Sequence, residues 1–267
     1  MNDNKSLCIE VFFACCEAMR NGVLIHRASK QDKEFHFQNW FSARLDGLNS
    51  AYDKPARNTY PDFRMVALTE GYEIKGLAYP GREANYDSNS QVPSGFHNGR
   101  DIYYVFGRYP KEAEEDDYPV IDLVVCHGDF LNVEHTYVHK NRSIKGFGSY
   151  GDIMIRDRKM YVAPTPFALT TGTTGQQTLI LPKSGGASDD RLVKVGDLTR
   201  VETEKFVIGY SFDLKKNEIR AELVDNPGAG NKHEFTAYRL KGTNGAEVTL
   251  KAGPIEVSED EDTDPTV

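Results

Sequence analysis

The chain has 267 residues, of which 39% are hydrophobic and 11% aromatic, and its formal net charge is −8. This composition supports a packed core and excludes a disordered chain, while the acidic balance argues against indiscriminate binding of nucleic acid. No apolar run approaches the roughly 18 residues that a membrane span needs. Residues 7–19 also lack the basic lead and cleavage site of a secretory signal. We therefore expect a cytoplasmic protein that contacts no membrane.

The four cysteines are also what we expect of a cytoplasmic protein. Cys8, Cys15 and Cys16 lie in one predicted helix, and Cys126 lies in a predicted strand. Neighbours such as Cys15 and Cys16 have poor geometry for a disulfide, and no Cys-x-x-Cys pair offers zinc ligands. We expect buried free thiols.

Two helices are predicted before the first long strands. Residues 5–20 carry apolar side chains at intervals of four, and Gly22 provides a left-handed cap after them. A second apolar stripe predicts a helix over residues 31–48. Glu34 and Gln38 lie one turn apart on a neighbouring stripe of that helix.

Residues 60–76 predict a hairpin, because two short apolar runs flank a polar turn. Alternate side chains of a strand share a face, so Glu73 and Lys75 should point one way and Ile74 the other. We expect the turn to place Asp62 roughly opposite Lys75. Two carboxylates and one ammonium would then meet at one place on a sheet.

Such a trio suits metal-assisted phosphoryl chemistry. Mg²⁺ prefers one or two protein carboxylates together with water and phosphate. A metal held in this way activates water and stabilises the charge of an in-line displacement. A neighbouring ammonium orients the attacking water and favours its deprotonation.

The motif stands as Pro61-Asp62, ten intervening residues, and Glu73-Ile74-Lys75. It resembles the motif of the PD-(D/E)XK nuclease superfamily, and most of all its type II restriction endonucleases. Two further acidic-x-Lys triplets, at 157–159 and 213–215, lack the strand–turn–strand frame. The resemblance covers roughly residues 30–130.

The resemblance implies an α/β fold with a restriction-endonuclease-like core, in which helices flank a mixed central β-sheet. It implies hydrolysis of double-stranded DNA at specific sites with Mg²⁺ as cofactor, usually by a homodimer, within a restriction–modification system. Asp62 and Glu73 would hold the metal, and Lys75 would orient and acidify the attacking water. In this family a helix before the motif often places an acidic or amide side chain near the metal, so Glu34 or Gln38 is a possible accessory residue. A solvated helix face is the alternative for both.

The polar stretch over residues 82–100 follows the second strand of the hairpin directly. Its side chains are of the types that contact base edges and phosphates, and a long loop inside a compact domain is more often functional than idle. A surface loop without function is the alternative. The candidate DNA contacts are Arg82, Asn85, Asn89, Gln91, His97, Asn98 and Arg100.

A second candidate for phosphate contact is the basic, glycine-rich stretch over residues 137–151. Its candidate contacts are Lys140, Arg142 and Lys145. We predict a loop there, and an ordinary solvated turn is the alternative.

The middle of the chain predicts two strands buried on both faces, at residues 101–107 and 120–127. Asp122 interrupts the second apolar run, which indicates a sheet-edge residue or a buried hydrogen-bonded group rather than a third metal ligand. For His127 and Asp129 we favour a turn with local hydrogen bonds.

From residue 189 onward the pattern is one of short strands, which indicates a β-rich subdomain or an extension of the main sheet. We therefore divide the chain into a nuclease core (1–185), a β-rich part (186–256) and an acidic disordered tail (257–267).

Other functions remain open at this point. One is a repair or modification-dependent nuclease of the same fold. Another is a non-catalytic β-rich binding module whose carboxylates are structural. A third is a carbohydrate-binding or carbohydrate-hydrolysing β-domain, since two carboxylates on a sheet also serve that chemistry.

Overall fold

The computed structural model describes residues 6–27, 33–54, 60–87, 92–112, 116–133, 143–147, 153–156, 161–162, 164–213, 215–216, 218–243 and 245–251. Within these residues the main sheet has nine strands. Their order is β14 (Leu192–Val201), β17 (Lys232–Leu240), β13 (Gln177–Pro182), β9 (Asp122–His127), β7 (Arg100–Pro110), β4 (Glu70–Tyr79), β3 (Phe63–Met65) and β2 (Tyr52–Asp53), with β6 (Phe96–His97) paired to β7 off this path.

The sheet is mixed, as the sequence predicts. Strands β4 and β7 run parallel, and so do β9 and β13, while the other neighbouring pairs are antiparallel. The fold is therefore α/β with a central mixed sheet. The finer expectation, a restriction-endonuclease-like core, stays a prediction.

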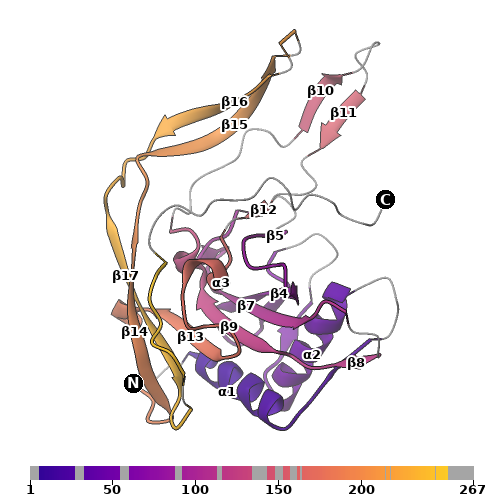
Figure 1. Cartoon of the computed structure of the whole chain (residues 1–267), viewed down its shortest axis with the longest axis vertical. Helices are drawn as coiled ribbons and strands as arrows, with labels where there is room; N and C mark the ends of the chain where they lie inside the picture. The colour runs from indigo at the N-terminus through magenta and orange to yellow at the C-terminus, as the bar shows by residue number, and fades with distance from the viewer. Residues whose placement is uncertain are drawn as a thin grey trace.

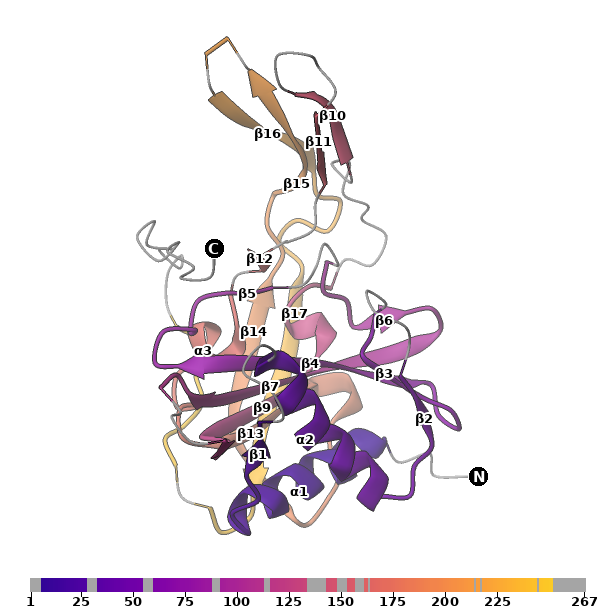
Figure 2. The ribbon, with the colours of Figure 1, turned by 90° about the vertical axis from the view of Figure 1, so that its right-hand side faces the viewer.

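Both long helices cover the same face of the sheet (Figures 1 and 2). Helix α1 (Leu7–Arg20) and helix α2 (Lys33–Gly47) match the predicted helices, and Gly22 follows α1 with a φ of 69°. Their apolar sides pack against Tyr72 and Ile74 in one core cluster. Among the described elements, the two long helices that flank the sheet thus lie on one face, and the connection from β4 to β7 carries the short strands β5 and β6.

The opposite face has a second core, to which no long helix among the described residues contributes. Alternate residues of β7 divide between the two cores: Tyr103 and Val105 join the first, and Tyr104 and Phe106 join the second. The short helix α3 (Pro166–Leu169) contributes to this second core. The predicted burial of β7 and β9 on both faces is confirmed.

Some of the C-terminal strands extend the main sheet, and others form a separate pair. Strands β14 and β17 belong to the main sheet, whereas β15 (Lys205–Asp213) and β16 (Glu218–Asp225) pair only with each other among the described residues. This β15–β16 ribbon projects from one end of the molecule beside β10 (Ser143–Phe147) and β11 (Ile153–Arg156), as Figures 1 and 2 show. The predicted strand at 247–250 is reduced to a bridge between Leu250 and Thr170.

Two more short pairs complete the described structure: β1 (Ile25–His26) with β8 (Asp117–Tyr118), and β5 (Tyr86–Asp87) with β12 (Tyr161–Val162). The stretch predicted as a loop over 82–100 therefore holds β5 and β6. All four cysteines are free and buried, as predicted. Among the described helices, none has both the length and the apolar character of a membrane span.

Candidate functional site

The β3–β4 hairpin brings the motif residues together with a register different from the predicted one. Phe63 pairs with Tyr72, and continuing this ladder places Asp62 opposite Glu73 rather than Lys75. The turn is shorter than expected because β4 already begins at Glu70. Glycine is needed at position 71, since a Cβ there would lie 2.6 Å from Cγ of Pro61.

Asp62 and Glu73 are joined through main-chain amides. The N–H of Asp62 donates to Oε2 of Glu73 at 3.2 Å, and the N–H of Ile74 donates to Oδ2 of Asp62 at 2.8 Å. The Asp62 carboxylate thus takes the place of a backbone acceptor where the β3 ladder ends. Two acidic side chains from neighbouring strands are fixed beside each other by these bonds.

Glu73 and Lys75 form an ion pair on the same face of β4, as alternation predicts. Nζ of Lys75 lies 2.8 Å from Oε1 of Glu73, and the two side chains are only 5% and 10% exposed, respectively. At a site so poor in water their attraction is much stronger than at a surface. The trio of Asp62, Glu73 and Lys75 is therefore one connected cluster.

The three members of the cluster differ in their exposure to solvent. Asp62 is half-buried, whereas Glu73 and Lys75 are buried. Asp62 is therefore the most exposed member of the trio; we call its side the open rim and the side of Lys75 the closed end.

The donor set fits a magnesium ion by its chemistry. Mg²⁺ needs only one or two protein carboxylates, and Asp62 and Glu73 supply two from adjacent strands. A group of three or more histidine, cysteine or acidic side chains placed to hold a metal is not found in the described part of the chain. A two-carboxylate site completed by water and phosphate does not require such a group.

Three tyrosines line the same face as the trio. The Tyr104 hydroxyl donates to the Tyr60 hydroxyl at 3.1 Å, and the Tyr60 hydroxyl donates to the carbonyl of Ser94 at 3.2 Å. The third, Tyr86, has its ring centroid 5.9 Å from Nζ of Lys75. His97 contacts Tyr60 edge-on at 4.9 Å, and burial lowers its pKa, with a smaller contribution from the charge of Arg64.

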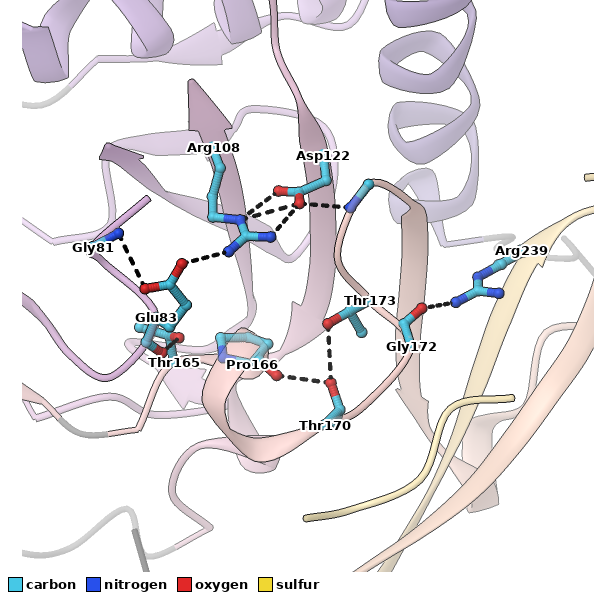
Figure 3. A network of polar contacts seen from close by, with 11 residues as sticks. Gly81, Glu83, Arg108, Asp122, Thr165, Pro166, Thr170, Gly172, Thr173 and Arg239 are labelled. Carbon is cyan, nitrogen blue, oxygen red and sulfur yellow. Dashed lines mark hydrogen bonds and ion pairs between the residues drawn. The ribbon is translucent and has the colours of Figure 1, made fainter. Parts of the chain in front are cut away.

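A second buried charge network lies on this face, around Arg108 and Asp122 (Figure 3). Both are fully buried, and Nε and Nη2 of Arg108 donate to the two carboxylate oxygens of Asp122 at 2.9 and 2.5 Å. The guanidinium also contacts Glu83 at 3.2 Å and lies between the rings of Tyr79 and Phe167. Asp122 is thus the buried hydrogen-bonded group that the sequence offered as one interpretation.

Glu83 connects this network to the segment that follows β4. Its main-chain carbonyl accepts a hydrogen bond from the Thr165 hydroxyl, and the carbonyl of Ala84 accepts one from the Thr165 N–H at 3.3 Å. The network therefore fixes the start of the segment that leads from β4 to β5.

The predicted DNA contacts are scattered. Arg82 and Asn98 are exposed, and Asn85 and His97 are half-buried. Asn98 has a φ of 49° and forms, with Gly99, the two-residue turn of the β6–β7 hairpin. Asn89, Gln91, Lys140 and Arg142 lie outside the described residues, and Lys145 is in β10 with a side chain outside the description.

Arg100 has a structural task that the sequence did not indicate. Its Nη1 donates to the carbonyls of Met65 and Leu68 at 2.7 and 2.8 Å, and so holds the β3–β4 turn. The stretch predicted as a basic loop over 137–151 also differs from the expectation, because 143–147 form strand β10.

Of the two candidate accessory residues, Gln38 is not brought to the trio. Gln38 is half-buried on α2, which packs on the face of Tyr72 and Ile74, whereas Glu73 and Lys75 project from the other face. The Glu34 side chain lies outside the description. His127 and Asp129 form the predicted local turn, in which the Asp129 N–H donates to Nδ1 of His127 at 3.3 Å.

Sequence reasoning missed Tyr86 and Arg108. A signal existed for Arg108, since a charged residue at the end of a strand buried on both faces requires a partner of opposite charge. Tyr86 had no comparable signal within the polar stretch around it. No family model, curated protein or solved structure matches this chain, so the comparisons assign no family and leave the site to be judged on its own geometry.

Proposed function

We propose that this protein is a Mg²⁺-dependent endonuclease that hydrolyses phosphodiester bonds of double-stranded DNA at specific sites, as type II restriction enzymes do. The observation that carries the proposal is the cluster of Glu73 and Lys75 on β4 with Asp62 directly before β3, with 2.8 Å between Glu73 and Lys75. The bonds between Asp62 and the β4 backbone fix the second carboxylate.

Each member of the cluster has a distinct role in this proposal. Asp62 and Glu73 would hold the metal, which when bound lowers the pKa of water and offsets charge on the phosphate. Lys75, at the closed end, orients the water and stabilises the hydroxide that forms from it. Asp62, at the open rim, is where the phosphodiester would arrive.

The arrangement of the projecting strands supports a long polyanion as substrate. The β15–β16 ribbon and the β10–β11 hairpin rise on the side of the sheet that carries β5 and β12, the face of Glu73 and Lys75 (Figure 2). Residues 140–159, which include β10 and β11, contain six lysines and arginines against two aspartates in a chain of net charge −8. Such a local excess of positive charge favours contact with phosphates. A homodimer on a palindromic site is part of the same proposal.

The test is digestion of plasmid and phage DNA by the purified protein with Mg²⁺, followed by sequencing of the fragment ends. We expect discrete fragments, no cutting in EDTA, and loss of cutting in Lys75→Ala with retained DNA binding. Lys183→Ala is the matched control, because Lys183 is exposed and pairs with Glu234 away from the trio. Unchanged cutting by Lys75→Ala would reject the assignment. Parallel digestion of methylated and unmethylated DNA separates a restriction enzyme from a modification-dependent or repair nuclease.

One observation favours a second candidate, a non-catalytic binding module. The Glu73–Lys75 pair is nearly closed to water, as a purely structural ion pair would be. This candidate predicts that DNA stays intact under all metal conditions and that Mg²⁺ does not raise the melting temperature.

A further inference from the structure

Tyr86 lies in β5, directly behind the trio in the second core. Its side chain is fully buried, with its ring edge-on to Phe106 at 5.1 Å and tilted against Tyr104 at 6.2 Å. The Lys75 ammonium is 5.9 Å from the ring centroid. Tyr86 is therefore packed by apolar neighbours on its ring and faces the closed end of the charged cluster.

The Tyr86 hydroxyl lacks a hydrogen-bond partner within the described part of the chain. The two neighbouring tyrosine hydroxyls have partners: Tyr104 donates to Tyr60, and Tyr60 donates to the carbonyl of Ser94. A buried polar atom without a partner is costly, and native proteins satisfy such atoms with a buried water when other polar groups converge on the same place. The candidates here are Lys75, whose ammonium lies 5.9 Å from the Tyr86 ring centroid, and Glu73, which is paired with Lys75 at 2.8 Å.

The hydroxyl is also held in its neutral form. Burial raises its pKa well above the ordinary value, and the acidic groups of Cys126, Glu73 and Tyr60 raise it further. A neutral phenol both donates and accepts a hydrogen bond, which is what a bound water requires of its neighbours.

We propose that the Tyr86 hydroxyl, with Glu73 and Lys75, holds the water that attacks the phosphodiester, so that Tyr86 positions the nucleophile. This inference rests on the proposed function. In this inference each reactant has its own side of the cluster. The water occupies the closed side, and the phosphate enters at the half-buried Asp62. An in-line displacement needs this arrangement, because nucleophile and leaving group must lie on opposite sides of the phosphorus.

The test compares the full-length wild-type protein with Tyr86→Phe, which removes one oxygen and keeps the ring. We expect the single-turnover cleavage rate at saturating DNA and Mg²⁺ to fall by about tenfold or more, as for a misplaced reactant. DNA affinity without divalent metal should not change, and the melting temperature should stay level or fall. Equal cleavage rates together with a higher melting temperature would show that the hydroxyl is only an unsatisfied group, and would overturn the inference.

Thr178→Val is the matched control. Its hydroxyl is also buried without a described partner, but it lies on β13, separated from β4 by β9 and β7. We expect this variant to cleave DNA at the wild-type rate. A decrease in cleavage rate equal to that of Tyr86→Phe would mean that removing any buried hydroxyl without a hydrogen-bond partner slows cleavage. That result would overturn the specific role of Tyr86.

A crystal structure separates this inference from the proposed function. If the wild type cuts no DNA, the nuclease proposal fails, and so does the part of the inference that names an attacking water. The water site itself is decided independently: a water within hydrogen-bond distance of the Tyr86 hydroxyl, absent in Tyr86→Phe, supports it. An empty space or a protein partner at that oxygen overturns it. The wild-type structure also decides the question if Tyr86→Phe does not fold.

Discussion

Oε1 of Glu73 and Nζ of Lys75 are 2.8 Å apart in a place from which water is almost excluded. Removing one partner of such a pair leaves an uncompensated buried charge, whereas removing both does not. The pair therefore offers a test of the fold that is independent of any activity.

Lys75→Met should lower the free energy of unfolding by about 3–5 kcal/mol, because the Glu73 carboxylate stays buried without its ammonium. Adding Glu73→Gln should recover much of this loss. Urea denaturation of the wild type, both single variants and the double variant measures the coupling. Additive losses would contradict the ion pair.

Asp62→Asn should separate the structural task of Asp62 from its proposed metal-binding task. The amide oxygen still accepts the hydrogen bond from the Ile74 N–H, so unfolding free energy should change by less than about 0.5 kcal/mol. The lost negative charge should reduce Mg²⁺-dependent cleavage by roughly a hundredfold or more, comparable with loss of an electrostatic contact in other active sites.

Asp62→Ala is the companion variant. It removes the acceptor as well, and should cost about 1 kcal/mol more than Asp62→Asn in the same denaturation experiment. Equal stability of the two variants would show that the bond from Ile74 contributes nothing.

Asp122→Asn should destabilise the protein strongly, by about 3–5 kcal/mol, since Arg108 would keep its charge in a fully buried position. Thermal unfolding followed by circular dichroism measures the effect. Glu83→Gln is the control, because the Glu83 side chain is 40% exposed, and its contact with Arg108 should contribute at most about 1 kcal/mol. A control loss as large as that of Asp122→Asn would show that Glu83, not Asp122, balances the guanidinium.

Glu202 should make the base of the β15–β16 ribbon sensitive to acid. Its carboxylate lies 2.8 Å from Nε2 of His233 and accepts hydrogen bonds from Asn226 and Asn231, and the contact with His233 is the main cause of its lowered pKa. Because the folded-state pKa lies below the ordinary value of 4.5, ionised Glu202 stabilises the fold above that pH. This contribution is lost as the pH falls through the folded-state pKa.

Melting temperatures between about pH 6 and pH 3 should therefore fall less steeply in Glu202→Gln than in the wild type. Glu204→Gln, an exposed position two residues away, should follow the wild-type curve. Hydrogen exchange of the β15 and β16 amides gives the local measure. A Glu202→Gln curve parallel to that of the wild type would contradict the role of this carboxylate.

The sequence predicted which three residues meet more accurately than it predicted the strand register that brings them together. Alternation along a strand correctly placed Glu73 and Lys75 on one face, because side-chain direction is a local property. The partner of Asp62 depends on where the turn ends, and that depends on Pro61 packing against Gly71, a contact between strands. The observed register differs from the predicted one by two residues, so Asp62 stays on the same face of the sheet but lies opposite Glu73 instead of Lys75.

Long-range contacts account for the other differences. The periodic spacing of apolar residues predicted α1 and α2 with bounds within two residues of those observed. No local pattern indicated that both helices cover the same face of the sheet. Arg100 matched the composition of a DNA-binding loop and instead holds the main chain of a turn more than 30 residues earlier. The basic, glycine-rich composition of 137–151 favoured a loop, but within it residues 143–147 pair with β11 as a strand.

Strand β4 is held by β7 along its whole length, and by the Asp62 carboxylate where β3 stops. In the proposed nuclease, Glu73 and Lys75 are thereby mounted on a rigid support, whereas the projecting β10–β11 and β15–β16 strands, at the proposed entrance, carry no member of the trio. Substitutions, insertions or deletions at the entrance would then alter which molecules are admitted while leaving the chemistry intact. A scaffold of this kind separates selectivity from reactivity, so that each is free to change without the other.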